Sequence, residues 1–420
     1  MSSRPGPPPS RQRRALTVVR GGRIERGGDR ALSEVLAEAL AAPARDPDAA
    51  RTFTHPFHTY PARMDPAAVR ALLRGLDARG PVLDPFCGSG TTLVEARAAG
   101  LAATGSDLNP LAVAIARAKT WTTPPARRRA LLETARAIAA ETLEEGKAAR
   151  RAGHRPAPRR RSAPARERRI AEWFAPHVRR ELEHIAALVD QESDREIADI
   201  LRVILSSILY KVSRRASDTD PRRVERNIAR GNPSRLFGAR AELLCAGLDE
   251  LARRHGPMPR VLVADARRLE VADGGFDLAI TSPPYAGTYD YADLHGLRMA
   301  FLGIDAGELA KKEIGPRARF AGARRDRALD EYQSDLAAAL DGIARALRPG
   351  GRAALVVGDS MAGRQPVRAD RILQSATPAS LALVAWAAQE RPALGGSEKR
   401  SFTSAPKREH ILLFERAPAA

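Results

Sequence analysis

The sequence predicts an α/β fold in which a mostly parallel, twisted sheet carries helices on both faces and is interrupted by a large helical insertion. Short apolar runs alternate with helical segments from residue 51 to residue 120. Strand-like runs return after residue 257, whereas residues 121–256 show helical periodicity alone. Strands and helices that alternate at this spacing are typical of parallel strands joined by right-handed crossovers.

The first part of the sheet is expected from two strand–turn–helix units. The segment PVLDPFCGSGTTLVEARAAG contains a short buried strand at Val82 and Leu83, a glycine turn, and a helix that begins near Thr91. The segment LAATGSDLNPLAVAIARAKT repeats this order. After the insertion, proline and glycine in RPGG close a helix. This helix is expected at 332–347, and the later strands at 260–267, 276–280, 352–359 and 409–416.

Apolar residues repeat at helical spacing in the insertion and predict two buried helix faces. The first face comprises Ile170, Phe174, Val178, Leu182 and Ile185, and the second comprises Ile197, Leu201, Leu205, Ile208 and Val212. Residues 151–169 are too basic and too rich in proline to pack, so we expect a mobile loop there. Residues 1–50 are expected to form a disordered basic tail with one possible helix at 31–42.

The charge of the chain favours a polyanionic partner. Its 420 residues include 69 Lys and Arg against 50 Asp and Glu, a net charge of +19. Arginine side chains release counterions from a phosphate backbone, although the base composition of the genome would also explain a chain rich in arginine and alanine. No apolar run approaches the length of a membrane span. Two cysteines, Cys87 and Cys245, give neither a disulfide framework nor a metal-ligand spacing, which suits a reducing cytoplasm.

Polar and glycine residues at three strand ends predict a site for a nucleoside. Gly88 and Gly90 lie between a strand and a helix, where a missing side chain lets backbone amides approach a ligand. Asp107 follows about 20 residues later, where a carboxylate can accept hydrogen bonds from both hydroxyls of a ribose. Asp265 ends another strand and is a candidate acceptor for an adenine amino group, with a surface carboxylate or a helix cap as the alternative.

The strand at 276–280 stops at Ser282-Pro283-Pro284-Tyr285, since two prolines cannot donate to a sheet ladder. This loop resembles the signature loop of the amino-methyltransferases, which transfer methyl from S-adenosylmethionine to an exocyclic nitrogen of a base. DPFCGSG (84–90) resembles the cofactor loop of that family, and GSDLNP (105–110) resembles its ribose-binding segment. HPFHTYPARM (55–64) looks like the segment that precedes the cofactor loop in many relatives.

The resemblance covers about 54–119 and 261–414 and implies a class I methyltransferase (Rossmann-like) fold with S-adenosylmethionine as the cofactor. A catalytic domain is therefore expected at 51–120 and 257–420, on either side of the helical basic insertion that periodicity predicts at 121–256. The residues that would bind the cofactor are Asp84, Pro85, Phe86, Cys87, Gly88, Gly90, Thr91, Asp107, Asn109 and Asp265.

The catalytic residues are expected to be Ser282, Pro283, Pro284 and Tyr285. An exocyclic amine is a poor nucleophile because its lone pair is delocalised into the ring. The Ser282 hydroxyl and the Pro283 carbonyl can accept its two hydrogens as the nitrogen attacks. Tyr285 can stack on a base flipped out of duplex DNA. This chemistry requires no metal and no thiolate.

The identity of the base follows from a tendency within the family. A serine at the first position of the loop favours cytosine-N4 in DNA, with adenine-N6 or an RNA base as alternatives. A non-catalytic DNA-binding protein and a dehydrogenase are rival interpretations; the intact loops disfavour the first, and the missing third glycine disfavours the second. A restriction partner, a phage-defence role and an orphan enzyme fit equally.

Several residues have two interpretations. Cys87 is a candidate nucleophile, but a small buried side chain near the cofactor is favoured. Tyr289, Asp290, Tyr291 and His295 either line the base pocket or pack inward and cap a helix. We assign target recognition to the insertion, and we expect deletion of 151–169 or replacement of Arg214 and Arg215 by Ala to weaken nucleic-acid binding. A solvated run of charge is the alternative for residues 210–223.

Overall fold

An eight-stranded mixed sheet forms the centre of the computed structural model, which describes residues 22–151, 170–217, 219–220, 222–320, 325–393 and 395–418. The strand order is β1-β9-β10-β6-β5-β2-β3-β4. The strands are β1 (Ile24–Gly28), β2 (Val82–Asp84), β3 (Ala103–Asp107), β4 (Arg260–Val263), β5 (Phe276–Thr281), β6 (Leu347–Gly358), β9 (Leu381–Arg391) and β10 (Lys407–Arg416). A separate two-stranded sheet pairs β7 (Ser360–Ala362) with β8 (Gln365–Val367).

Most strands of the large sheet run in one direction. Parallel pairing joins β4, β3, β2, β5 and β6, whereas β10 is antiparallel to both β6 and β9. β9 therefore points the same way as the parallel strands, and only β10 and β1 run against them. This arrangement confirms the mostly parallel sheet expected of a class I methyltransferase fold.

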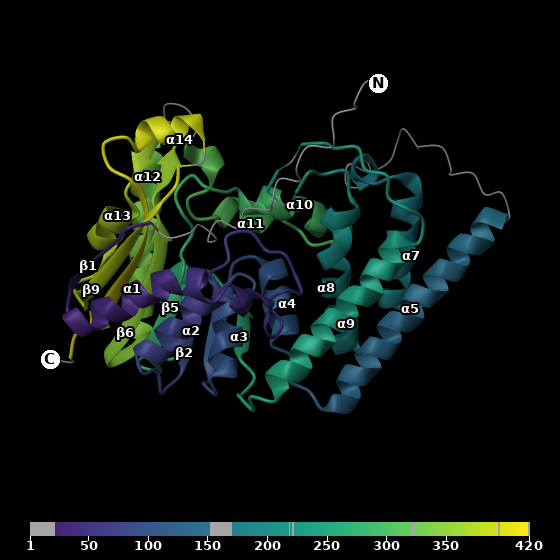
Figure 1. The fold of residues 1–420 in the computed structure, drawn as a ribbon, viewed down its shortest axis with the longest axis horizontal. Helices are drawn as coiled ribbons and strands as arrows, with labels where there is room; N and C mark the ends of the chain where they lie inside the picture. Colours follow the sequence, from purple (N-terminus) through teal and green to yellow (C-terminus); the bar gives the residue numbers. More distant parts are fainter. Residues whose placement is uncertain are drawn as a thin grey trace, which may run out of the picture.

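Helices cover both faces of this sheet (Figure 1). One face packs against α1 (Arg30–Arg45), α2 (Pro66–Gly75), α3 (Thr91–Ala98) and α4 (Pro110–Lys119), and the other against α12 (Arg325–Ala346) and α13 (Ala369–Ala376). Alternation of side chains along a strand divides the core accordingly. Leu278 and Ile280 of β5 are buried on the first face, and Ala279 between them is buried on the second.

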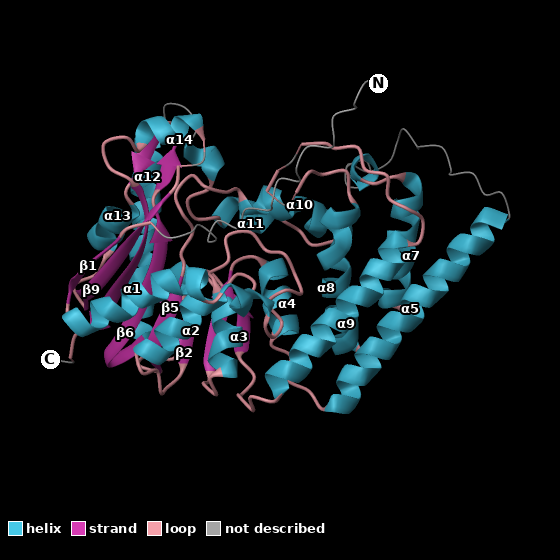
Figure 2. Cartoon of the chain, in the orientation of Figure 1, coloured by secondary structure: helices cyan, strands magenta, loops and turns pink. Residues whose placement is uncertain are grey.

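The insertion is helical, as its periodicity predicted. It consists of α5 (Pro125–Arg151), α7 (Pro176–Asp190), α8 (Arg195–Val212) and α9 (Asn232–Ala252), which stand beside the sheet in Figure 2. Both predicted apolar faces are buried in one core with residues of α4 and α10 (Tyr291–Leu302). Residues 152–169, nearly all of the expected mobile loop, lie outside the described residues.

The prediction of a disordered tail over residues 1–50 is wrong from residue 24 onward, where the chain forms β1, α1 and a 3-10 helix (Pro47–Arg51). β1 extends the sheet by pairing with β9. α1 contains the predicted helix at 31–42 and buries Leu36, Ala39 and Leu40 against the sheet, which is enough apolar surface to order the segment. Residues 1–21 lie outside the described residues.

Two further short α-helices are α11 (Gly307–Lys312) and α14 (Gly396–Ser401). Three 3-10 helices also occur in the described chain, at Pro47–Arg51, Ala266–Arg268 and Arg317–Phe320. Among the described residues, no helix combines the length and the apolarity that a membrane span needs.

Candidate functional site

Two cavities lie at the carboxyl ends of the parallel strands and meet at the loop after β5. The chain enters the parallel sheet at β2, from which β3 lies on one side and β5 on the other. Ligands of open α/β sheets bind where the strand order reverses in this way. We call the two spaces the glycine-loop cavity and the tyrosine cavity. Ala62, Ser282 and Tyr291 line both of them.

The glycine-loop cavity encloses about 670 Å³, including the space open to solvent. It brings together eight of the residues predicted from the sequence: Pro85, Phe86, Gly88, Asp107, Asn109, Asp265, Ser282 and Pro284. They come from the turns after four separate strands, β2, β3, β4 and β5. Strand ends that are far apart in the sequence therefore share one cavity.

Asp107 is held in a fixed orientation in this cavity. Its Oδ2 accepts from the Gly88 amide at 2.9 Å, and its Oδ1 accepts from the Asn109 amide at 2.8 Å. Burial raises the pKa of Asp107 to about 6, because the charged form loses solvation. Each carboxylate oxygen has a second lone pair. Above pH 6 the group can thus accept two further hydrogen bonds from a ligand.

The remaining residues of the DPFCGSG loop lie behind the cavity wall. Asp84 Oδ1 accepts from the Thr281 hydroxyl at 2.6 Å and from the Phe86 amide at 3.2 Å, which ties the end of β2 to the end of β5. Burial raises the pKa of Asp84 to about 6. Gly90, with φ +79°, begins α3, and a Cβ there would lie 2.9 Å from Ala116 Cβ of α4. Thr91 is buried in the first turn of the same helix.

Cys87 packs into the core and does not line either cavity. Burial raises the pKa of its thiol well above the usual value, so the thiolate that a nucleophile requires is disfavoured. These observations support the structural interpretation of Cys87 over the nucleophilic one.

Asp265 reaches the glycine-loop cavity, but a neighbouring guanidinium occupies its carboxylate. Arg267 Nε donates to Oδ1 at 2.9 Å, and a second nitrogen of the same guanidinium donates to Oδ2 at 2.6 Å. Burial alone would raise the pKa of Asp265, but these hydrogen bonds hold it below its usual range. The Arg267 amide also donates to Oδ1 at 3.0 Å, so one lone pair on Oδ2 is left to accept from a ligand, and the role of Asp265 stays a prediction.

Sequence reasoning missed part of the cavity wall. Tyr60 lies in the quoted HPFHTYPARM segment and stacks on His295, with 4.7 Å between ring centroids. Leu309, Glu313 and Ile314 come from α11 and the turn after it. Burial raises the pKa of Glu313 to about 7. Only the HPFHTYPARM motif gave a signal for any of these residues.

The tyrosine cavity, of about 780 Å³ with its opening, has Ser282, Pro283 and Tyr285 on one wall. Tyr289 and Tyr291 also line it, with 5.7 Å between their ring centroids, so both belong to the pocket wall. His295 instead lies buried behind the wall, and Asp290 accepts from the Ala318 amide at 2.8 Å. The other walls come from α1, α2, residues 62–65 with the charged Arg63 and Asp65, β6, β9 and β10.

The proline loop has a defined geometry between the two cavities. Ser282 Oγ lies 3.4 Å from the Tyr285 hydroxyl, and the Tyr332 hydroxyl donates to the Pro284 carbonyl at 2.8 Å. The Tyr285 ring lies against Gly358, where a Cβ would be only 2.8 Å from Tyr285 Cε2. Within the described residues, the Pro283 carbonyl accepts no hydrogen bond. It therefore keeps its capacity to accept from a ligand.

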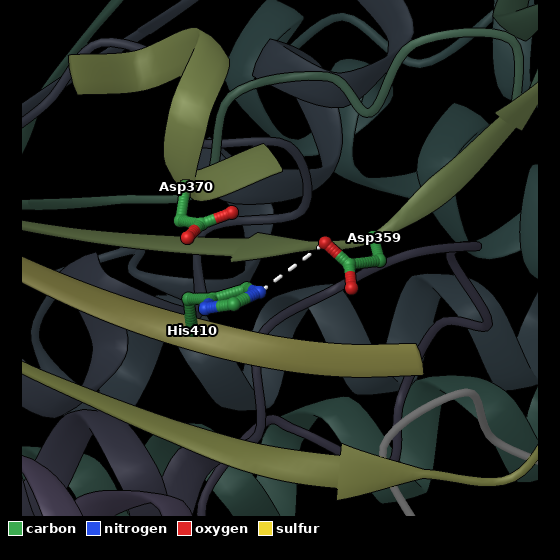
Figure 3. Close-up of side chains that lie close together, drawn as sticks. All are labelled: Asp359, Asp370 and His410. Carbon is green, nitrogen blue, oxygen red and sulfur yellow. Dashed lines mark hydrogen bonds and ion pairs between the residues drawn. The ribbon is translucent and has the colours of Figure 1, made fainter. Parts of the chain in front are cut away.

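Asp359, Asp370 and His410 lie close together and are residue types that can bind a metal ion (Figure 3). Asp359 Oδ1 accepts from His410 Nε2 at 3.2 Å and from the Ala369 amide, and Oδ2 accepts from the Arg368 guanidinium at 2.7 Å and from the Arg408 amide. Four donors, one of them cationic, surround this carboxylate. Because these donors already occupy the carboxylate oxygens, Asp359 links the surrounding segments by hydrogen bonds and does not fit a metal centre.

Comparisons with known proteins give limited support. No family model matches the chain. A stretch of 81 residues is 38% identical to the type II methyltransferase M.MvaI of Kocuria varians and covers 18% of this chain and 18% of that protein. The chain thus matches less than a fifth of the length of this curated relative.

Several solved structures share a coarse likeness with the chain. TrmN from Thermus thermophilus has a TM-score of 0.33 at 16% identity, over 90% of this chain and 53% of that one. The rRNA methyltransferase aviRa from Streptomyces viridochromogenes has a TM-score of 0.33 at 14% identity, over 88% and 92%. A SAM-dependent methyltransferase from Methanosarcina mazei has a TM-score of 0.30 at 10% identity, over 81% and 94%. Scores of this size decide neither substrate nor reaction.

Proposed function

We propose that the chain transfers a methyl group from S-adenosylmethionine to an exocyclic amine of a base in duplex DNA, with cytosine-N4 as the favoured position. The observation that carries this proposal is the position of Ser282, which lines both cavities. One cavity has the features of a nucleoside site, and the other is aromatic and large enough for a base. A group that touches both spaces lies where donor and acceptor must meet.

The glycine-loop cavity fits S-adenosylmethionine. Asp107 accepts from the two ribose hydroxyls, because its carboxylate is fixed by the Gly88 and Asn109 amides and keeps free lone pairs. Asp265 lies at the next strand end, where the adenine amino group would be accepted. Phe86 and Ile314 offer apolar surface to the ring. The cofactor supplies an electrophilic methyl group on a sulfonium.

The proline loop activates the amine. The Ser282 hydroxyl and the Pro283 carbonyl accept its two hydrogens, so that the nitrogen lone pair turns from the ring toward the methyl group. Tyr285 supports the base by stacking, and its ring is kept in place by Gly358 beneath it. The prolines fix the carbonyl direction before the base arrives, which is preorganisation.

The insertion contributes the DNA contact. An open groove between α5, α7 and the start of α9, which we call the basic groove, is lined by Lys147, Arg150, Arg151, Arg180, Arg230 and Arg235. Its acids are Glu145 and Glu181, and Glu181 is buried and accepts from the Gly231 amide at 2.7 Å. Such an excess of cations is suited to a phosphate backbone.

Arg215, one of the two arginines expected to contact nucleic acid, does not fit that role. Its side chain is 7% exposed, and the guanidinium carbon lies 5.3 Å from the centroid of the Tyr210 ring. Arg214 is half-buried next to it. The basic groove therefore replaces this pair as the proposed DNA-contacting surface of the insertion.

The test is methyl transfer from tritiated S-adenosylmethionine to duplex DNA and, in parallel, to RNA. Nucleoside analysis of the labelled product should give N4-methylcytosine. Label on adenine-N6 would correct the base but keep the reaction class. Label on ring carbon, or on RNA alone, would overturn the proposal.

A further inference from the structure

An ion pair lies in the wall of the tyrosine cavity, on the side formed by β9 and β10, while Arg63 and Asp65 contribute the other charged side chains of the lining. Arg391 is the last residue of β9, and Glu409 lies on the neighbouring strand β10. Arg391 Nε donates to Glu409 Oε2 at 3.1 Å, and a second guanidinium nitrogen donates to the same oxygen. Their side chains are 10% and 13% exposed. Removing two charges from water is costly, so a pair in this position calls for a reason.

The fold holds Glu409 on the cavity side of its strand. Asp359 accepts from the ring of His410, as Figure 3 shows, and from the peptide nitrogen of Arg408. Arg408 and His410 are the two chain neighbours of Glu409. Side chains alternate along a strand, so anchoring His410 on one face directs Glu409 to the other. Arg391 pairs in register with Lys407, which makes it a diagonal neighbour of Glu409 within reach of a long side chain.

The pair also faces the proline loop. Glu409 lies opposite Gly358 of β6, against which the Tyr285 ring packs. The pKa of Tyr285 is raised first by burial and then by the charge of Glu409. The Tyr285 hydroxyl is in turn 3.4 Å from Ser282 Oγ. The ion pair and the predicted amine-binding group thus lie on either side of one tyrosine, around a single cavity.

We propose that Arg391 reads the target base by donating to the ring nitrogen N3 and the carbonyl O2 of a cytosine whose N4 amine is held at Ser282. Glu409 is a positioning residue, which fixes the guanidinium but does not touch the base. The inference rests on the proposed function and adds the feature that selects the base. A guanidinium presents donors in a planar fork, and cytosine offers two adjacent acceptors beyond its amine.

The same arrangement disfavours adenine. Next to its amine, adenine offers N1 as an acceptor, but the following position is a C2–H group that accepts nothing. One donor of the fork would then lose its partner, on a guanidinium side chain that is only 10% exposed. Discrimination by a two-hydrogen-bond contact of this kind is roughly 10- to 100-fold.

The test combines a change in the side chain with a change in one base atom. Wild-type enzyme and Arg391→Met are compared on a duplex oligonucleotide that carries either cytosine or 3-deazacytosine at the position that the wild type methylates. Replacing N3 by carbon should lower the wild-type kcat/KM roughly 10- to 100-fold, as expected for one lost fork contact. The Arg391→Met enzyme should show little further loss, because it no longer donates to N3.

Two variants keep this test decisive. Arg391→Lys keeps the charge without the fork and serves if the Met variant does not fold. The ratio of kcat/KM for cytosine to kcat/KM for 3-deazacytosine should fall only in part in Glu409→Gln. A purely structural role of Glu409 would not change this ratio. The matched control is Arg352→Met, which breaks the Arg352–Glu415 pair at the other end of β10 and should leave the wild-type ratio unchanged.

If the ratio of kcat/KM for cytosine to kcat/KM for 3-deazacytosine is the same in wild type and Arg391→Met, the proposed role of Arg391 is wrong. The proposed reaction would not be affected by that result. Wild-type methylation of adenine instead of cytosine would overturn this inference together with the choice of base. No methyl transfer to DNA at all would overturn the proposed function itself, and binding of S-adenosylmethionine by calorimetry shows whether the glycine-loop cavity survives that result.

Discussion

The carboxyl edge of the sheet and the helical insertion differ in how precisely their functional groups are positioned. At the edge, individual atoms matter: Asp107 is fixed by two amides, and Ser282 stands between two cavities. In the insertion, the basic groove is defined by an excess of charge spread over three helices. Methyl transfer needs a geometry held within fractions of an ångström, whereas a phosphate backbone only needs positive charge at a suitable spacing.

This contrast predicts different responses to substitution. Changes at the edge should affect one step strongly and leave DNA binding intact. Changes in the groove should each have a small effect on affinity that adds with the others, and should leave the chemistry of the bound complex unchanged.

Ser282→Ala should reduce methyl transfer by roughly 100-fold or more, the size of effect seen when one preorganised polar group is removed from a reacting centre. Affinity for S-adenosylmethionine and for DNA should stay within a few-fold of wild type. Single-turnover transfer of tritiated methyl measures the rate of methyl transfer. Calorimetry measures the affinity for S-adenosylmethionine, and filter binding measures the affinity for DNA. Thr288→Ala, which removes a hydroxyl from the same loop, is the matched control. An active Ser282→Ala enzyme would place the chemistry elsewhere.

Affinity for S-adenosylmethionine should fall as the pH drops below 6. Burial holds the pKa of Asp107 at about 6, and only the ionised carboxylate accepts from both ribose hydroxyls. One pH unit below the pKa roughly a tenth of the enzyme is ionised, so affinity at pH 5 should be about tenfold weaker than at pH 7.5. Calorimetry between pH 5 and pH 7.5 measures the affinity for S-adenosylmethionine.

The control for this pH dependence is Asp107→Asn. This variant should bind the cofactor more weakly at pH 7.5 and show a nearly flat profile down to pH 5. If the affinity of Asp107→Asn for S-adenosylmethionine falls with pH as steeply as that of wild type, the titrating group is Asp84 and not Asp107. Burial also raises the pKa of Asp84 to about 6.

The edge was largely predictable from the sequence because its residues sit at strand ends. Gly88, Asp107 and Ser282 follow short apolar runs, and parallel strands bring their carboxyl ends to one side. The parts that escaped prediction depend on contacts between distant segments. β9 reads LALVAWAAQER, in which alanine and glutamine favour a helix, and it becomes a strand because β10 and β1 pair on either side of it. Arg391 was missed with β9, whereas Glu409 lies at the start of the strand predicted at 409–416 and only its pairing with Arg391 was missed.

The insertion was predictable in a different respect. Its two apolar faces follow directly from helical periodicity and are buried as expected. The basic groove could not be predicted, since it depends on how α5, α7 and α9 are placed against one another. Arg215 could not be placed either, because a local run of charge gives no sign that one of its members is buried on a tyrosine ring.

Replacing Arg150, Arg230 and Arg235 by Gln should weaken binding to duplex DNA roughly tenfold at 150 mM salt and reduce the slope of log K against log salt by about 2 to 3. Among the described residues these three arginines form no ion pair. Fluorescence anisotropy over a salt series measures both quantities. Cofactor affinity should not change.

The matched control removes the same charge from the opposite side of the molecule. Arg74 lies near the end of α2, Arg253 follows the far end of α9, and Arg260 begins β4 at the amino edge of the sheet. All three are exposed. The control variant carries Gln in place of Arg74, Arg253 and Arg260. If this variant loses as much affinity for duplex DNA as the groove variant does, the effect comes from net charge and the basic groove has no special role.

Arg215→Ala should change stability and not DNA affinity, which separates the two kinds of arginine within the insertion. The guanidiniums of Arg215 and Arg298 lie 5.3 Å and 4.3 Å from the centroid of the Tyr210 ring, and the Tyr210 hydroxyl donates to the Leu294 carbonyl of α10. A buried contact between a cation and a ring contributes about 1–2 kcal/mol, and urea denaturation should show a loss of that size. Arg214→Ala, at the half-buried neighbour, should cost less. A fall in DNA affinity for Arg215→Ala at unchanged stability would restore the direct DNA contact that the charge run first suggested.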